Sequence, residues 1–471
     1  MSPSKNERDA RDRRRKEREA TEDAASQEAL ATVYAHIMDR APEHDIDPTL
    51  DRVARVLELL GDPQKAYRTI HVAGTNGKTS TARMVERLVR EHGLRTGRFT
   101  SPHLTSVTER IAVDGESLTA GEFVAVWEDV APYVGVVDRE SEESGGPRLS
   151  FFEVLTVMAF AAFADAPVDV AVVEVGMGGT WDSTNVVDGE VAVITPVAFD
   201  HERWLGHTLP EIAENKAGII VDGATVIVGE QEQVAELVIL ETAAERNARV
   251  LRDGVDLEVA GRTPAVGGQL LNLRTPAGLY TEIFLPVLGA HQAHNALLAL
   301  ASVEAFLGGR ALGGEVVEAA FADVTSPGRL EVLRSSPTVL VDAAHNPAGA
   351  EALVAALEES FAFTHLVGVV AVMADKDAEA LLAVLEPHLA EIVVTSNSAD
   401  RSADPLDLAD TAREVFGEDR VHVVEQLGDA VARAADLAEA EDTVGVGTGT
   451  GVLVTGSVIT AADARALLRR R

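Results

Sequence analysis

The segment from Gly74 to Ser80 carries residue types that bind a phosphate chain. It consists of Gly74, Thr75, Asn76, Gly77, Lys78, Thr79 and Ser80. Backbone N–H groups at a helix start, together with the helix dipole, hold polyphosphates. Lys78 can reach the terminal phosphates, and a hydroxyl of Thr79 or Ser80 can approach a magnesium ion. The common motif needs a glycine where this chain has Val72, so a turn with an exposed lysine remains the alternative.

Glu174 is a second candidate because it directly follows the apolar run Val170–Val173. A buried carboxylate is costly unless it has a partner or serves a ligand. It would also lie at the carboxyl end of a parallel strand, where ligand sites of open α/β sheets form. A paired structural glutamate is the alternative. For His201, a structural role and a role as metal ligand are equally compatible with the sequence.

The elements that must position these residues alternate between strands and helices. A buried strand is predicted at 67–73 and a helix at 80–92, which together form a first βα unit. Nearly continuous apolar runs at 168–175 and 190–197 predict strands buried on both faces of a parallel sheet. We expect a small antiparallel excursion at 224–286 and a long apolar helix at 291–307. Further strands are predicted at 338–341, 365–373, 391–396, 420–424 and 442–446.

This alternation predicts an α/β protein of two domains. Residues 1–25 form a charged tail, and residues 26–326 form a large phosphate-loop domain with a mostly parallel sheet. Residues 327–471 form a smaller Rossmann-like domain. The boundary is placed at Ser326-Pro-Gly, which interrupts both patterns.

The composition excludes several classes of function. The chain has no cysteine, so disulfides, thiolate metal sites and a cysteine nucleophile are impossible, and a bound metal would be a hard cation such as magnesium. A net charge of −35 argues against nonspecific nucleic-acid binding. No stretch approaches the roughly 20 apolar residues of a membrane span, and the charged start lacks the apolar core of a signal peptide. We therefore expect a cytoplasmic protein.

Eight segments, in order along the chain, resemble the dihydrofolate synthase and folylpolyglutamate synthase family of the Mur ligase superfamily. They are His71–Lys78, Thr100–Leu104 with Glu109–Ile111, Phe151–Glu153, Glu174–Asn185, Asp200-His201 with Lys216–Ile219, His291-Gln292 with Asn295, Pro327–Arg329, and Asp342–Pro347. The resemblance covers nearly the whole chain from about Ile46. It implies an enzyme that activates a carboxylate with ATP and couples it to an amine.

The resemblance also implies roles for individual residues. It implies that Ser101, Glu174 and His201 coordinate magnesium, and that a carbamylated Lys216 holds a second ion. Asn295 would meet adenine, and Arg329 and Asp342 would contact ATP. His345 would lie near the incoming glutamate or phosphate. The catalytic set is therefore Lys78, Glu174, His201, Lys216 and His345.

A pterin pocket is implied by the same resemblance. Its expected residues are Pro48, Thr49, Leu50, Ser150, Phe151, Phe152, Glu153, Trp181, Asp182 and Ser183. Phe151 and Phe152 are equally credible as core residues. This chain departs from the family pattern at Thr79, where the family often has glycine. It departs again at Thr180, where the family commonly has arginine.

The activity implied is ATP-dependent ligation of L-glutamate to dihydropteroate and to folate monoglutamates through an acyl phosphate. The expected partners are these small molecules, and the family suggests a monomer. A cell-wall Mur ligase that acts on a UDP-linked muropeptide is the first alternative. The second alternative is a dehydrogenase or nucleotide-binding module in which Gly445–Gly451 forms a dinucleotide-binding loop. Val452, however, stands where the fingerprint needs glycine or alanine.

Overall fold

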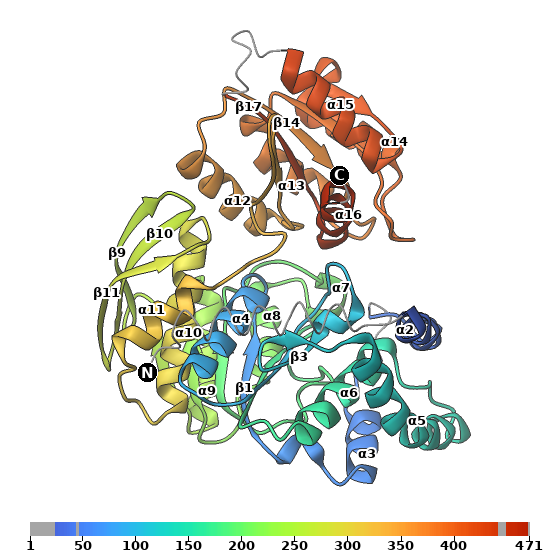
Figure 1. Cartoon of the computed structure of the whole chain (residues 1–471), viewed down its shortest axis with the longest axis vertical. Helices are drawn as coiled ribbons and strands as arrows, with labels where there is room; N and C mark the ends of the chain where they lie inside the picture. The colour runs from blue at the N-terminus through green and yellow to red at the C-terminus, as the bar shows by residue number, and fades with distance from the viewer. Residues whose placement is uncertain (1–23, 44–46, 441–448, 470–471) are drawn as a thin grey trace. The chain divides into compact units, whose positions relative to one another are not determined.

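The computed structural model describes residues 24–43, 47–440 and 449–469 of the 471-residue chain. Two compact units are formed (Figure 1). The first comprises the chain up to Arg262 together with 270–285 and 293–324. The second comprises 263–269, 286–292 and the chain from Thr325 onward. The predicted α/β fold with two sheet-containing domains is confirmed.

The first unit is built on an eight-stranded sheet in the order β4-β3-β2-β5-β1-β6-β7-β8. The strands are β1 Arg68–Ala73, β2 Thr96–Phe99, β3 Ile111–Val113, β4 Glu116–Ser117, β5 Val170–Glu174, β6 Gly189–Ile194, β7 Thr225–Val228 and β8 Arg249–Arg252. The six strands from β2 to β8 in this order are parallel, whereas β3 and β4 are antiparallel edge strands. Parallel strands buried on both faces explain the continuous apolar runs.

Helices accompany this sheet along the chain. They are α2 Ala24–Met38, α3 Asp51–Leu59, α4 Lys78–Glu91, α5 Ala120–Glu143, α6 Phe151–Asp165, α7 Glu202–Leu205, α8 Leu209–Ala217, α9 Gln233–Glu245, α10 Ala290–Phe306 and α11 Gly314–Ala322, with short 3₁₀ turns at Pro63–Lys65 and Val107–Arg110. Three of them start with a capping box, in which a hydroxyl and a glutamate three residues later bond each other's backbone N–H. These boxes fix where α5, α6 and α8 begin.

Alternating side chains of the central strands divide the core of the first unit. Ala171 and Val173 join Phe99 in an apolar cluster with α2, α3, α5 and α6. Successive strand residues point to opposite faces, so Val172 and Glu174 point to the other face of β5. Helix α4 packs against β5 there and covers the Glu174 side.

The predicted antiparallel excursion is wrong for its first part. Residues 224–252 contain the parallel strands β7 and β8 and the helix α9 between them. Only β9 Glu258–Ala265, β10 Gly268–Thr275 and β11 Gly278–Leu285 form the separate three-stranded sheet, in the order β11-β10-β9. Their two-residue connections permit only antiparallel pairing. Short Val-rich runs occur in both parallel and antiparallel strands. Which kind forms depends on the neighbouring strand with which the run pairs.

The second unit contains a six-stranded sheet in the order β12-β13-β17-β14-β15-β16. Its strands are β12 Glu331–Ser335, β13 Thr338–Val341, β14 His365–Val370, β15 Glu391–Val394, β16 Val421–Val423 and β17 Thr450–Thr455. All neighbours are parallel except the β12–β13 pair. The helices are α12 Pro347–Ser360, α13 Ala378–Leu385, α14 Pro405–Phe416, α15 Leu427–Ala440 and α16 Val458–Arg469, with 3₁₀ turns at Glu386–His388 and Glu418–Arg420. Apolar side chains pack on both sides of this sheet.

The dinucleotide interpretation of Gly445–Gly451 fails on chain order. Residues 441–448 lie outside the described residues, and so does the strand predicted at 442–446. Gly449 directly precedes β17, and its carbonyl accepts hydrogen bonds from the N–H groups of Thr364 and His365. A dinucleotide loop must instead follow a strand and open a helix.

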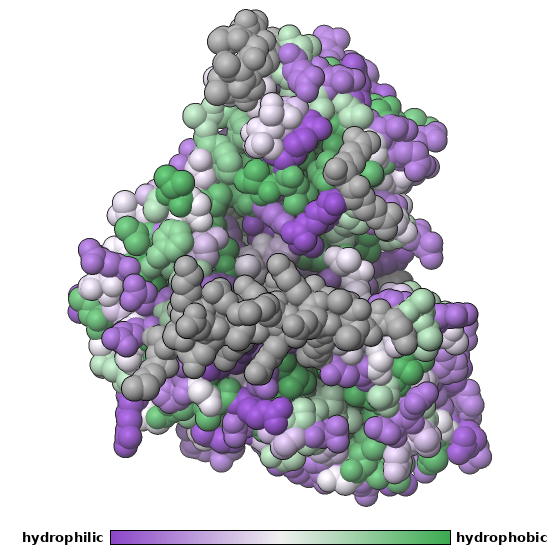
Figure 2. Space-filling model, in the orientation of Figure 1, coloured by the Kyte–Doolittle hydropathy of each residue, from purple (hydrophilic) through white to green (hydrophobic). Residues whose placement is uncertain are grey.

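The surface mixes hydrophilic and hydrophobic residues over the face drawn in Figure 2. Exposed large apolar side chains occur at scattered positions, such as Val255, Val266 and Leu406. Among the described residues, no helix combines the length and apolar character needed to span a bilayer.

Candidate active site

The loop between β1 and α4 has the backbone geometry of a phosphate cradle. Gly74 and Gly77 adopt φ values of 139° and 90°, which favour glycine. A Cβ on Gly74 would overlap the Thr195 hydroxyl, and one on Gly77 would lie 2.5 Å from Oδ1 of Asn295. The first N–H groups of α4 lack intrahelical acceptors, as at every helix start. The loop thus offers donors to an anion, and Asn295 lies directly against it.

Lys78, the first residue of α4, lies over this loop. Its Nζ donates to the carbonyl oxygens of Gly74 and Thr75, both at 3.1 Å. The two carbonyls hold the ammonium beside the cradle, within reach of a bound polyphosphate. The alternative of a simple turn with an exposed lysine does not fit this half-buried side chain.

Glu174 ends β5 with a relative exposure of 1%. Its Oε1 accepts a 2.8 Å hydrogen bond from the hydroxyl of Thr79, and its Oε2 accepts a 3.3 Å bond from the N–H of Ser101. Three residues of the predicted site, 22 to 95 positions apart in the chain, therefore meet beside the loop. Carboxylate and hydroxyl oxygens are the ligands that a hard cation prefers, so this donor set fits magnesium.

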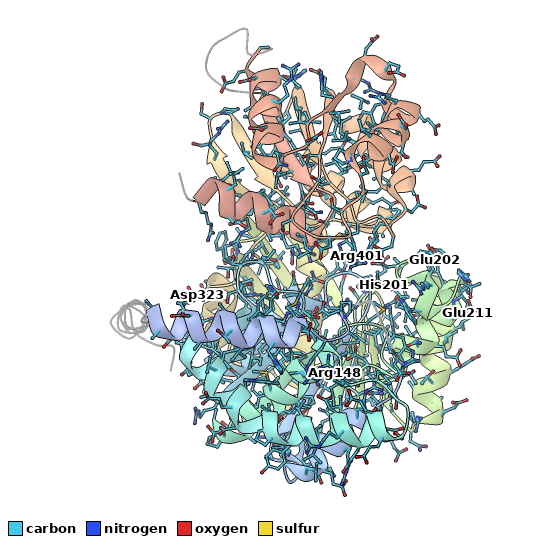
Figure 3. All side chains as sticks on the ribbon, turned by 90° about the vertical axis from the view of Figure 1, so that its right-hand side faces the viewer. Arg148, His201, Glu202, Glu211, Asp323 and Arg401 are labelled. Carbon is cyan, nitrogen blue, oxygen red and sulfur yellow. The ribbon has the colours of Figure 1, made fainter. Side chains whose placement is uncertain are left out.

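His201 lies at the start of α7, next to Asp200. Its Nε2 is 3.8 Å from Oδ2 of Asp200, and its φ of 53° is unusual for a residue other than glycine. Figure 3 shows His201 and Glu202 near Glu211 of α8. Within the described part of the chain, no group of three or more His, Asp and Glu side chains is arranged around a metal position. The role of His201 as a metal ligand therefore stays a prediction.

Lys216 is buried at the end of α8 beside the phosphate loop. Its Nζ donates to the carbonyl oxygen of Gly74 at 2.8 Å. Burial, and then the nearby Lys78, lower the pKa of Lys216 to about 7, although Asp200 and Asp182 act in the opposite direction. The amine is therefore substantially neutral at physiological pH, unlike a surface lysine. The structure brings the two lysines of the predicted catalytic set to the same loop.

The glycine-rich turn after β5 packs on the end of α8 that carries Lys216. The buried carboxylate of Asp182 accepts from the N–H of Met177 at 2.8 Å and from Thr184, whose hydroxyl lies 2.5 Å away. Burial raises the pKa of Asp182. Thr180, where the family pattern has arginine, is exposed and bonds the carbonyl of Asn215. Asp182 therefore organises the turn, whatever else it contacts.

Two further residues of this predicted pocket pack nearby. The hydroxyls of Ser183 and Thr156 lie 3.0 Å apart. Trp181 is half-buried against the apolar cluster of α8 and α9. Neither contact tests the prediction that these residues line a pterin pocket.

The segment Ser150–Glu153 opens α6, and each residue has a structural role. Ser150 caps the helix, and Glu153 completes its capping box. Phe151 lies in the core, and Phe152 stands 5.5 Å from Phe99, ring centre to ring centre, as the core alternative predicted. These contacts account for the residue types without a ligand, and the predicted pterin contacts remain untested.

Arg52 of α3 is a residue that the sequence analysis missed. Its guanidinium donates to both carboxylate oxygens of Glu153, at 3.1 and 3.3 Å, and to Asp47 at 2.6 Å. Asp47 precedes Pro48, Thr49 and Leu50, so this pair ties the predicted pterin loop to α6. The signal was an arginine two residues after that loop, but its partner lies 101 positions away.

Replacing Arg52 with methionine is expected to destabilise the first unit by about 3–5 kcal/mol, because it leaves the buried Glu153 carboxylate without its cation. Urea unfolding measures this change. Arg55→Met is the matched control on the same helix, since Arg55 makes only exposed ion pairs and should change stability little. Equal destabilisation by both variants would contradict the prediction.

In the second unit, the predicted residues gather at the carboxyl end of β13. The buried Asp342 accepts from the N–H groups of Leu330 and Ala344, at 2.7 and 2.8 Å. Burial raises the pKa of Asp342, while the nearby Arg329 acts in the opposite direction. Nδ1 of His345 is 2.9 Å from the carbonyl oxygen of Ala343, so this nitrogen carries a proton and donates to that oxygen.

Known proteins match this chain over nearly its whole length. Residues 72–303 match the Mur ligase middle domain, and residues 328–451 match the Mur ligase, glutamate ligase domain. A dihydrofolate synthase/folylpolyglutamate synthase of Mycobacterium tuberculosis is 51% identical over 92% of this chain and 93% of its own. This chain belongs to the dihydrofolate synthase/folylpolyglutamate synthase family.

Other members of the family agree in sequence and in structure. The Bacillus subtilis dihydrofolate synthase/folylpolyglutamate synthase is 34% identical over 78% of this chain and 85% of its own. A structure of Mycobacterium tuberculosis folylpolyglutamate synthase with ADP and AMPPCP has a TM-score of 0.90 and 48% identity, covering 95% of this chain and 99% of the other. The predicted family and the predicted class of ATP-dependent, amide-forming ligase are confirmed.

Proposed function

We propose that this chain uses ATP to join L-glutamate to dihydropteroate and to folate monoglutamates. The main support is that Glu174 contacts Thr79 and Ser101 beside the phosphate loop. Two lysines, Lys78 and Lys216, bond the backbone of the same loop. That arrangement suits transfer of a phosphoryl group to a carboxylate. A cell-wall Mur ligase acting on a UDP-linked muropeptide is not favoured, because relatives at 51% and 34% identity carry the folate-ligase name.

The first step transfers the γ-phosphoryl group of ATP to the substrate carboxylate. The loop amides bind the phosphates, and the ammonium of Lys78 neutralises charge that develops on the γ-phosphoryl oxygens. A magnesium ion held by Glu174, Ser101 and His201 would neutralise further charge on the same phosphates. The carboxylate oxygen bonds to phosphorus while the bond to ADP breaks, which leaves an acyl phosphate and ADP.

The second step forms the amide. The neutral amine of glutamate attacks the acyl carbon, phosphate leaves, and the amine proton passes to solvent. We assign Asn295 to adenine and Arg329 and Asp342 to ATP, and we place His345 near the incoming glutamate. Support comes from the position of Asn295 against Gly77, and from the place of His345 three residues after Asp342 at the end of β13. No enzyme nucleophile takes part.

The decisive experiment is an assay of ADP release that requires glutamate, with ATP and magnesium. Separate reactions contain dihydropteroate, a reduced folate monoglutamate or a UDP-muropeptide, and blanks omit glutamate or the acceptor. We expect turnover with both pterin substrates. Turnover with the muropeptide alone would replace the proposal with the cell-wall alternative. Sedimentation of the same sample tests the proposed monomer, and cell fractionation tests the proposed cytoplasmic location.

A further inference from the structure

Beyond the phosphate loop, one face of α4 carries Thr79, Arg83 and Glu86. Residues spaced by four and three positions lie along one side of a helix. Thr79 donates to Glu174 at 2.8 Å, and Glu86 accepts from Nε of the buried Arg98 at 2.6 Å. Helical side chains lean toward the helix N-terminus, so Arg83 leans toward the turn that carries Thr79, and Glu174 is among the charges that act on it.

Arg83 has no acceptor of its own among the residues that the structure describes. It makes neither a hydrogen bond nor an ion pair with any residue that the structure describes. Each acidic group around it accepts a hydrogen bond from another residue. Glu109 accepts from the N–H groups of Leu104, Thr105 and Ser106, and the buried Oε1 of Glu86 has no hydrogen-bond partner at all. A structural arginine would be expected to satisfy that oxygen.

Arg83 is positively charged at neutral pH although its surroundings lower its pKa. Burial, and then repulsion from Arg98, lower the pKa of Arg83 to about 10, while Glu86, Glu109 and Glu174 act in the opposite direction. The side chain is half-buried, so its donors remain open to a ligand. A guanidinium with donors in a planar fork matches a carboxylate.

The position of Arg83 separates it from the nucleotide. It stands five residues beyond Lys78, so the two side chains leave different sides of the helix. The charged groups that act on it include Glu174, at the end of β5, and Glu109, in the segment that follows β2. The anion that reaches it would be the second substrate, which must bring a carboxylate close to the γ-phosphate.

We propose that Arg83 binds the carboxylate of the pterin substrate, the group that ATP phosphorylates. The inference rests on the proposed function and adds a substrate-binding residue to it. Arg83 holds one carboxylate oxygen and leaves the other free to attack phosphorus. Removal of this contact therefore weakens binding of the carboxylate and leaves the binding of the rest of the pterin substrate unchanged.

The test compares dihydropteroate with its carboxamide, which has the same ring system and no charge. Binding of each is measured calorimetrically to the wild type, Arg83→Gln and Arg83→Lys, with magnesium and a non-hydrolysable ATP analogue. Arg83→Gln should weaken dihydropteroate binding about 10- to 100-fold, the range for a hydrogen bond to a charged group. Carboxamide and nucleotide affinities should change less than about twofold.

Arg87→Gln is the matched control, because Arg87 lies one turn further on and pairs with Glu91 and Asp323. It should leave all three affinities unchanged. If Arg83→Gln does not fold, Arg83→Lys should still show a smaller loss that is confined to the carboxylate. Equal loss for both pterins, loss of nucleotide affinity or no loss would overturn the inference. Turnover by the wild type shows separately whether the proposed function holds.

Discussion

Lys78→Ala is expected to lower turnover on the order of 10³-fold, equivalent to about 4 kcal/mol of transition-state stabilisation. The ammonium lies beside the phosphate cradle, where charge develops on the γ-phosphoryl oxygens. The two carbonyls that it contacts can accept hydrogen bonds from water instead, so the fold should persist. Glutamate-dependent ADP release measures turnover, and calorimetry measures the affinity for ATP.

Lys65→Ala is the control for charge and side-chain length. Lys65 is exposed and pairs with Asp62 three residues earlier, away from the loop. Its removal should leave turnover unchanged. A Lys78→Ala enzyme that keeps more than about a tenth of wild-type turnover would show that the loop amides and the metal suffice to neutralise the phosphoryl group.

Lys216→Met is the second large change, and we expect a loss of turnover on the order of 10²- to 10³-fold. The buried amine touches the loop at Gly74 and is substantially neutral near pH 7. A neutral amine attacks carbon dioxide, forms an N–C bond and releases a proton, which gives the predicted carbamate. Methionine has a similar length and cannot react.

The carbamate gives a readout that is independent of activity. Wild-type protein in ¹³C-labelled bicarbonate should show a carbamate carbon signal by NMR, and Lys216→Met should not. Full turnover of Lys216→Met, or an unchanged signal in this variant, would exclude the assigned role. Lys65→Ala should keep both the signal and the turnover.

Stability should also depend on pH through Lys216. In buffer free of carbon dioxide, its pKa is about 7 in the folded chain and near 10.5 in the unfolded chain. Between these values the unfolded chain binds more protons, so the contribution of Lys216 to the free energy of unfolding rises with pH. Urea unfolding from pH 7 to 10 should show a steeper rise for the wild type than for Lys216→Met.

Local sequence patterns predicted most of the individual elements and most candidate residues. The glycine spacing and the apolar strand before it located the loop, because these features act within a few residues. Ordered motifs identified the family, and the run ending at Glu174 placed a carboxylate at the end of a buried strand. Hydroxyl-x-x-Glu patterns similarly mark where α5, α6 and α8 begin.

Long-range packing determines which of these residues come into contact. Strand β5 pairs with β1 about a hundred positions away, and that pairing brings Glu174 to the hydroxyl of Thr79. Lys216 reaches the Gly74 carbonyl across 142 positions, and its neutral amine is a product of that burial. The contact between Arg52 and Glu153 likewise joins residues that are 101 positions apart. Local propensity cannot predict such contacts, because they arise from the strand order and from the packing of helices that are distant in sequence.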